Sequence, residues 1–323
     1  MLSFGLPRPT DTIAGKVGVA GNSRRVIPKK ACVLFSRAAS AWVIMKTTSQ
    51  IDPTSVREAV RKTYGQIALN EQKSCCVQDS ASCCGSERPA ATAAKSLGYS
   101  SDEIAALPEG ADLGLGCGNP QAIASLKPGQ TVLDLGSGAG FDCFIAAQSV
   151  GLSGHVIGVD MTPEMIAKAR ANTSKAGITN VDFRQGEIEA LPVADNSIDV
   201  IISNCVINLS PDKLRVFREA RRVLKPGGRL AVADIVRTAE LPPELARDLA
   251  AHCGCVAGAA TIEELETMLR EAGFTEIRIR PKDASREFIR RWVEGRNAAD
   301  YVVSATIEAV KPTEACCGPT CCK

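Results

Sequence analysis

Cysteine is the residue type in this chain with the greatest capacity for chemistry, because the 323 residues include fourteen cysteines but only two histidines, His155 and His252. With so few histidines, a histidine base or a histidine metal cage has almost nothing to draw on. Eight of the cysteines form adjacent pairs, at positions 75/76, 83/84, 316/317 and 321/322. Such pairs favour binding of a soft metal or metalloid, or redox exchange, in a reducing compartment.

A glycine-rich turn in VLDLGSGAG is the second feature with chemical meaning. Glycines there allow the backbone to approach a ligand closely, and dinucleotide sites use a similar loop at a helix N-terminus. Asp134 lies two residues before the first glycine, Asp160 ends the apolar run HVIGVD, and Glu187 lies in GEIE after the next run. This order predicts a nucleotide-type pocket at the ends of successive strands.

Alternating strands and helices must position these residues. Apolar, β-rich runs are found at residues 131–135, 155–160, 181–185, 198–204 and 229–236. Helical segments separate them at residues 141–149, 163–176 and 213–224. This alternation predicts an α/β fold with a doubly wound, mostly parallel sheet covered on both faces. The alternating C-terminal run VVSATIEAVKP is expected to add a last strand.

The cysteines outside the pairs are expected to converge beside this sheet. In an open parallel sheet the carboxyl ends of the strands line the ligand crevice, so Cys205, at the end of the fourth strand, should face it. Cys117 in LGCGNP and one of Cys253 and Cys255 in HCGCVAGA are its expected companions. Three thiolates make a trigonal soft site. Such a site suits trivalent arsenic, which binds three sulfurs and keeps a nucleophilic lone pair. We interpret Cys143 as a buried core residue.

Composition excludes two classes of protein. The chain is 45% hydrophobic and 23% charged, an ordinary balance, and no apolar run approaches the roughly 18 residues that a membrane span needs. A net charge of +2 and only 4% aromatic residues disfavour a nucleic-acid partner. We therefore expect neither a membrane nor nucleic acid as a partner.

The charge distribution marks off the N-terminus. Residues 1–49 hold eight basic residues and one acidic residue, whereas the rest holds 30 basic and 35 acidic residues. This extension resembles an organelle transit peptide, or the functional protein starts at Met45. The location is then mitochondrial in the first case and cytoplasmic otherwise. The expected segments that follow are a helix and Cys-rich loop (50–110), a cofactor domain (111–240), a closing region that binds the acceptor (241–310) and a Cys-rich tail (311–323).

The series VLDLGSGAG, HVIGVD, GEIE and LKPGG covers residues 130–236 and resembles the class I S-adenosylmethionine-dependent methyltransferases, which have a Rossmann-like fold. The resemblance implies S-adenosylmethionine as the cofactor. It further implies that Asp160 binds the ribose hydroxyls, that the loop glycines approach the methionine part, and that Glu187 or Ile188 contacts adenine. The expected cofactor-binding residues are Asp134, Gly136, Gly138, Gly140, Asp160, Met161, Glu187, Ile188 and Asn204. A nicotinamide enzyme is the alternative, but no hydride-acceptor constellation supports it.

Further segments, DLGLGCGNP, VIGVDMTPEMI, SNCVINLS and CVAGA, resemble the arsenite S-adenosylmethionine methyltransferases over about residues 53–275. The resemblance implies that Cys117, Cys205 and Cys255 bind trivalent arsenic, the substrate, and that methylated arsenicals are the products. It also implies an upstream catalytic cysteine that forms a disulfide with the loop cysteine during turnover. Cys75 and Cys76 both fit that role. Thiol reductants such as thioredoxin or glutathione are the implied partners.

Two other functions stay open at this stage. One is a methyltransferase that acts on the carbon of a small organic acceptor, and the other is a thiol protein that sequesters metalloids. The tail ACCGPTCC either folds its four sulfurs toward one soft metal ion or is an oxidation-prone segment without a function.

Overall fold

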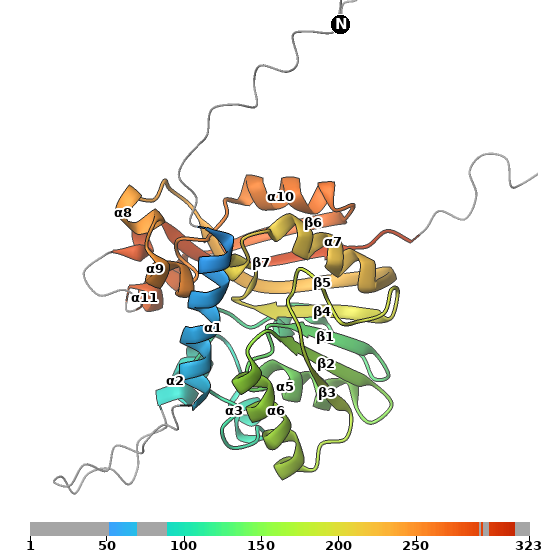
Figure 1. The fold of residues 1–323 in the computed structure, drawn as a ribbon. Helices are drawn as coiled ribbons and strands as arrows, with labels where there is room; N and C mark the ends of the chain where they lie inside the picture. Colours follow the sequence, from blue (N-terminus) through green and yellow to red (C-terminus); the bar gives the residue numbers. More distant parts are fainter. Residues whose placement is uncertain (1–51, 70–88, 291, 293–296, 314–323) are drawn as a thin grey trace, which may run out of the picture. The chain divides into compact units, whose positions relative to one another are not determined.

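A computed structural model describes residues 52–69, 89–290, 292 and 297–313. Its centre is a seven-stranded sheet with strand order β3-β2-β1-β4-β5-β7-β6 (Figure 1). The strands are β1 (Thr131–Leu135), β2 (His155–Asp160), β3 (Val181–Gln185), β4 (Ile198–Asn204), β5 (Leu224–Arg237), β6 (Thr275–Lys282) and β7 (Val302–Val310). The extension 1–49, the cysteine pairs and nearly all of the tail lie outside the described residues.

The first five strands are parallel, and β7 lies antiparallel between β5 and β6. The predicted α/β fold with a mostly parallel sheet is confirmed. The direction of the strand order reverses at β1, because its neighbours are β2 on one side and β4 on the other. A crevice for a ligand is expected at this switch point, outside the carboxyl ends of the strands.

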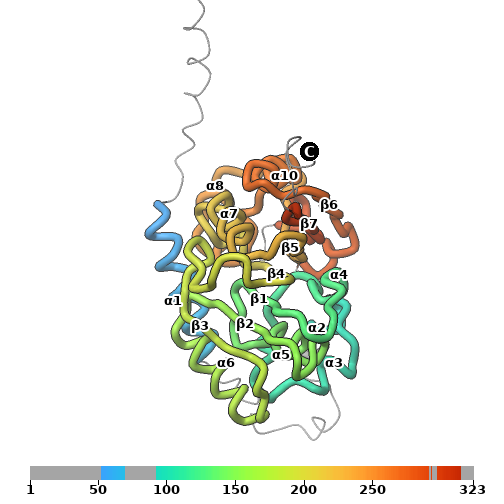
Figure 2. The backbone as a smooth tube through the Cα atoms, turned by 90° about the vertical axis from the view of Figure 1, so that its right-hand side faces the viewer, coloured from blue at the N-terminus to red at the C-terminus, as the bar shows by residue number. Residues whose placement is uncertain are grey.

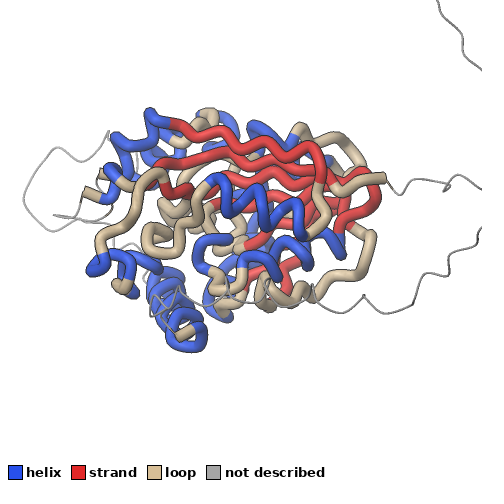
Figure 3. The backbone as a smooth tube through the Cα atoms, turned by 90° about the horizontal axis from the view of Figure 1, so that it is seen from above, coloured by secondary structure: helices blue, strands red, loops and turns tan. Residues whose placement is uncertain are grey.

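Helices cover both faces of the sheet, as Figure 3 shows. Val132 and Val156 pack into one core with α5 (Phe141–Val150) and α6 (Pro163–Ala176). Leu133 and Ile157, which point the opposite way, pack into the other core with α7 (Lys213–Val223) and α10 (Ile262–Glu271). Figure 2 shows α7 and α10 beside each other, next to β4 and β5. Because both faces are buried, the central strands are apolar throughout rather than alternating.

The strand β6 was not anticipated by the sequence reading. Its segment TEIRIRPK is charged and largely exposed, and it pairs only with β7 at the edge of the sheet. Charged side chains on an edge strand discourage pairing with other chains. The expected boundary between the cofactor domain and the closing region, at residue 240, lies just after β5. The closing region contains β6 and β7, which belong to the same sheet as the strands of the cofactor domain.

The remaining helices are short except for α1 (Pro53–Leu69), which lies in the segment 50–110 where a helix is expected. The short helices are α2 (Pro89–Ser96), α3 (Ser101–Ala105), α4 (Gln121–Ala124), α8 (Pro243–Ala246), α9 (Leu249–Cys253) and α11 (Arg286–Ile289). Three 3-10 segments are η1 (Ile207–Leu209), η2 (Asp283–Ser285) and η3 (Ala298–Asp300). Among the described helices, none combines the length and apolar character of a membrane span.

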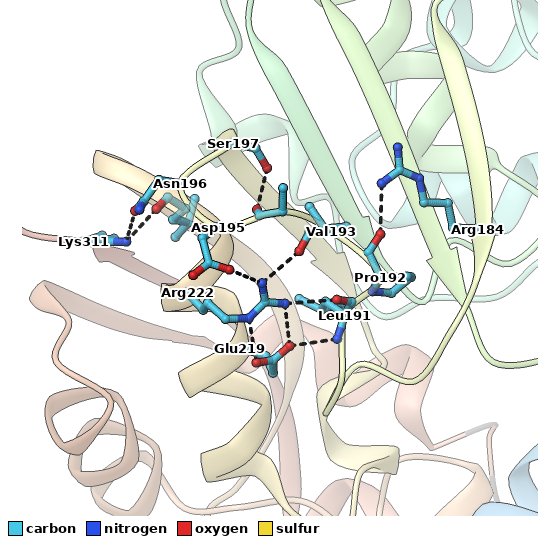
Figure 4. A network of polar contacts seen from close by, with 12 residues as sticks. Arg184, Leu191, Pro192, Val193, Asp195, Asn196, Ser197, Glu219, Arg222 and Lys311 are labelled. Carbon is cyan, nitrogen blue, oxygen red and sulfur yellow. Dashed lines mark hydrogen bonds and ion pairs between the residues drawn. The ribbon is translucent and has the colours of Figure 1, made fainter.

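Arg222 anchors the loop before β4 to α7 (Figure 4). Its guanidinium donates to Glu219 and Asp195 and to the carbonyl oxygens of Leu191 and Val193, at 2.6 to 3.0 Å. One side chain therefore satisfies several backbone acceptors of an irregular loop. The loop is held at the amino end of β4, so it supports the sheet rather than the crevice at the opposite end.

Candidate functional site

A cavity of about 480 Å³ lies at the carboxyl ends of the strands. The glycine loop after β1, Asp160 at the end of β2, and Asn204 and Cys205 at the end of β4 all line it. The helix α1 closes the opposite side with Arg57, Val60, Thr63, Tyr64 and Ile67. The cavity therefore occupies the crevice that the strand order predicts.

The glycine loop brings the backbone close to the cavity. Gly136 and Gly138, which both line the cavity, have φ values of 71° and 51°, in the left-handed region that favours glycine. A Cβ atom at Gly136 would lie 2.4 Å from Cγ2 of Val206, so no larger residue fits there. Gly140 also has a positive φ, but it begins α5 and packs against Phe144 rather than lining the cavity.

Asp160 is fixed at the end of β2 by two backbone amides. The N–H of Gly138 donates to its Oδ2 at 3.0 Å, and the N–H of Thr162 donates to its Oδ1 at 2.8 Å. Burial raises the pKa of this carboxyl group, and the two amides act against that shift. Each oxygen keeps a further lone pair, so the carboxylate can accept hydrogen bonds from a pair of hydroxyls.

The amide of Asn204 is already engaged within the protein. Its Oδ1 accepts from the N–H of Cys117 at 3.0 Å, and its Nδ2 lies within 3.2 Å of the Gly118 carbonyl, the Tyr99 hydroxyl and Asp142. The side chain lines the cavity, but its polar atoms hold the loop that carries Cys117. The sequence predicts that Asn204 binds the cofactor, but its amide already makes hydrogen bonds within the protein.

Two buried carboxyl groups lie beneath the glycine loop. Asp134 accepts a hydrogen bond from the Cys143 thiol at 3.3 Å, and Asp142 accepts from the Tyr99 hydroxyl at 2.8 Å. Burial raises the pKa of both groups, and the charge of Asp142 adds to the shift at Asp134. Tyr99 and Asp142 were not among the expected site residues. The available signal for Asp142 was an acidic residue in the first turn after a glycine loop.

Three predicted cysteines meet beside the cavity. The Sγ atoms of Cys117 and Cys205 and a carboxylate oxygen of Asp234 all lie within 4.8 Å of one another. The Sγ of Cys255 donates to the Cys205 carbonyl at 3.0 Å. Cys205 and Cys255 have φ values of 60° and 61°, a strained conformation for residues other than glycine. Such strain persists where the surrounding structure enforces it, and it often marks a functional position.

The thiols influence one another electrostatically. Burial raises the pKa of Cys117 to about 11. The hydrogen bond with Cys117 raises the pKa of Cys205 above its usual value, and the hydrogen bond with Cys205 does the same for Cys255. The three neighbouring thiols therefore stay protonated until a soft acceptor binds and replaces their protons.

Asp234 is a further residue of this group that sequence reasoning missed. The backbone amides of Ile207 and Ile235 and the side chain of Asn208 donate to its carboxylate at 2.7 to 3.0 Å. Burial still raises its pKa to about 6. An aspartate inside the apolar run RLAVADIV was the available signal, since a buried acid must have partners.

The helix α1 forms the lid of the cavity. Arg57 pairs with Glu189 at 3.3 Å and with Glu187 at 3.6 Å, and Arg61 also pairs with Glu187 at 3.6 Å. At the other end, the Lys168 ammonium donates to the Ala68 carbonyl at 3.3 Å. The sequence predicts a helix in the segment 50–110 but does not predict its place over the cavity.

The expected cofactor residues fall into two groups. Asp134, Gly136, Gly138, Asp160, Met161, Ile188 and Asn204 line the cavity. Gly140 and Glu187 do not. Glu187 instead lies on the surface, where it pairs with α1, and the neighbouring cavity residues are Gly186 and Glu189. Cys75 and Cys76 lie outside the described residues.

Known proteins resemble this chain in sequence and structure. A family described as a methyltransferase domain matches residues 126–273. A protein named arsenite methyltransferase from Halobacterium salinarum is 55% identical over 267 residues, which cover 81% of this chain and 68% of that protein. One of the same name from Aquipseudomonas alcaligenes is 42% identical over 69% of this chain and 63% of that protein. The crystal structure of an arsenic (III) S-adenosylmethionine methyltransferase from Chlamydomonas reinhardtii is 34% identical, with a TM-score of 0.51, over 70% of this chain and 74% of that one.

Proposed function

The chain belongs to the arsenite methyltransferase family, and from that premise we propose that it transfers methyl groups from S-adenosylmethionine to trivalent arsenic held by Cys117, Cys205 and Cys255. The observation that carries the proposal is that the thiols of Cys117 and Cys205 lie within 4.8 Å of each other, with the Cys255 thiol on the Cys205 carbonyl, beside a cavity at the strand ends. A soft, three-coordinate acceptor matches three sulfurs better than a carbon acceptor does.

The cavity has the features that S-adenosylmethionine requires. Gly136 and Gly138 line the cavity with backbone alone, and Asp160 presents a carboxylate fixed by two amides. We propose that these residues, with Met161 and Ile188, hold the methionine, ribose and adenine parts. When bound, S-adenosylmethionine supplies an activated methyl group on a sulfonium centre.

The thiols take up the substrate by exchange. Each cysteine gives its proton to a hydroxide or thiolate that leaves arsenic, and a sulfur–arsenic bond forms in its place. Asn204 holds the loop of Cys117 and so sets the position of that thiol relative to Cys205. No histidine base is needed, because the attacking electron pair already resides on arsenic.

Turnover also requires a source of electrons. Transfer of a methyl cation to the lone pair leaves arsenic oxidised by two electrons. We propose that Cys117 and one of Cys75 and Cys76 return them by forming a disulfide, which a thiol reductant such as thioredoxin or glutathione then reduces. A reducing compartment, the cytoplasm or the mitochondrial matrix, fits this requirement.

A labelling experiment tests the assignment. The full chain is incubated with arsenite, methyl-labelled S-adenosylmethionine and a thiol reductant, and arsenic species are separated. Label in methylated arsenicals is the expected result. Tight arsenite binding without transfer would favour a sequestering protein instead, and a chain that neither binds nor methylates arsenite would point to an organic acceptor.

A further inference from the structure

Within the part of the chain that the structure describes, four cysteines lie in or beside the wall of the cavity, one more than a trigonal site uses. Cys205, Cys253 and Cys255 line the cavity. Cys117 does not line it, and its Sγ points to the Ala233 carbonyl at 3.6 Å. Cys117 and Cys255 are both buried, at 1% and 3% exposure, so the cavity lining and not exposure separates them. The three cysteines that line the cavity are therefore a different set from the three proposed to hold arsenic for methylation.

Cys253 is held in position by the lid helix. It ends α9, where its Sγ accepts a hydrogen bond from the Thr63 hydroxyl at 3.7 Å. Its carbonyl accepts from the Tyr64 hydroxyl at 3.1 Å. Tyr64 lines the cavity together with Cys205, Cys253 and Cys255. Three cysteines from two segments of the chain therefore line the cavity that α1 covers, and α1 contacts one of them directly.

Building on the proposed function, we propose that Cys253 is a further arsenic-binding thiol, which holds trivalent arsenic together with Cys205 and Cys255 before Cys117 replaces it. In the first stage three thiol protons combine with three departing hydroxides as water, and three sulfur–arsenic bonds form. In the second stage the Cys117 proton moves to the Cys253 sulfur as one sulfur–arsenic bond exchanges for another. No oxidant or reductant is required.

This order also explains how a buried thiol is reached. Cys117 lies behind the cavity wall, so arsenic bound at Cys205 and Cys255 would have to move inward to meet it. A third sulfur on the cavity side keeps arsenic three-coordinate until that step. The acceptor is thereby retained while the site is still open to water.

The test uses Trp292, which lines the cavity, as a local reporter of arsenic binding. Trp42 is the second tryptophan in the chain, so all variants carry Trp42→Phe. Fluorescence titrations without cofactor compare the parent, Cys117→Ser, the double variant Cys117→Ser/Cys253→Ser and the matched double variant Cys117→Ser/Cys143→Ser. Each is titrated with arsenite, which takes up to three thiols, and with methylarsenite, which takes two.

We expect Cys117→Ser to bind arsenite within about threefold of the parent, because Cys253 supplies the third sulfur. Replacing Cys253 as well should weaken arsenite binding at least about tenfold, while the Cys143 double variant stays like Cys117→Ser. All variants should bind methylarsenite alike, which shows that the pair Cys205 and Cys255 is intact. Equal arsenite affinity in the two double variants, or loss of arsenite binding in Cys117→Ser alone, would overturn the role of Cys253. A parent that binds no arsenite would overturn the proposed function itself.

Discussion

The Sγ atom of Cys255 donates a hydrogen bond to the backbone carbonyl of Cys205 at 3.0 Å, although 50 residues separate the two in the chain. Both residues have a left-handed backbone conformation, and Cys205 is anchored by its own N–H to the Ala233 carbonyl. The contact joins the loop after β4 to the loop after α9. The acceptor site is thus built where two irregular turns meet, rather than on a regular element.

Replacing Cys205 with serine should separate methyl transfer from cofactor binding. We expect transfer to arsenite to fall at least about a hundredfold, because a hydroxyl is a poor ligand for a soft metalloid. The affinity for S-adenosylhomocysteine should stay within about threefold, measured by calorimetry. A large loss of cofactor affinity would instead place the thiol in the cofactor pocket.

Alanine substitutions at two glycines with similar backbone conformations test whether the glycine loop approaches the cofactor. Gly136 and Gly177 have φ values of 71° and 65°, but a Cβ atom at Gly177 would meet nothing within 4 Å. Alanine at either position should cost about 1 kcal/mol of folding free energy through strain. Only Gly136→Ala also collides with Val206, so it alone should weaken cofactor binding, by about tenfold or more. Similar cofactor affinities for the two variants would contradict the close approach of the loop.

Asp160→Asn tests the carboxylate at the end of β2. The amide has one acceptor oxygen in place of two, so it cannot satisfy both backbone N–H groups and a ligand. Hydrogen bonds to a charged group contribute about 1.5 to 3 kcal/mol, which predicts an affinity loss of about 10- to 100-fold for S-adenosylhomocysteine. Asp182→Asn, on the neighbouring strand and paired with Arg184 at 2.7 Å, is the control and should bind as the parent does.

The raised thiol pKa values predict how arsenite binding depends on pH. The pKa of Cys117 is raised to about 11, so this thiol stays protonated far above neutral pH. Neutral arsenite then exchanges hydroxide for thiol with release of water and no net proton. Affinity reported by Trp292 fluorescence should change less than about threefold between pH 6.5 and 8 and fall only at higher pH. A tenfold decrease within that range would show that a thiol with a much lower pKa takes part.

Glu187 and Glu189 differ in their expected importance. Glu187 was expected to contact adenine, but it lies at the surface with 40% of its side chain exposed, in ion pairs with α1. Exposed pairs of this kind contribute at most about 1 kcal/mol, so Glu187→Gln should change cofactor affinity by less than about fivefold. Glu189 lines the cavity and accepts from Ser210 at 2.6 Å. Glu189→Gln should therefore weaken cofactor binding more than Glu187→Gln does. If titrations show the larger loss for Glu187→Gln, Glu187 contacts the cofactor after all.

Much of the fold was accessible from the sequence because local patterns specify it. The strands 131–135, 155–160, 181–185 and 198–204 and the helix 163–176 have the predicted bounds. Their apolar periods and terminal turn residues are local properties. The edge strand β6 escaped detection because its charged segment lacks the apolar pattern of a buried strand, and only pairing with β7 stabilises it.

The sequence by itself determined the parallel part of the sheet, the glycine loop and the candidate cysteines, since residue types and their spacing express those features directly. Only the tertiary structure decided which groups share the site. It placed Asp234 beside Cys117 and Cys205, engaged the Asn204 amide within the protein, and laid α1 across the cavity with Cys253 beneath it. These relationships depend on contacts between segments more than 25 residues apart, and no local pattern in the chain encodes such distances.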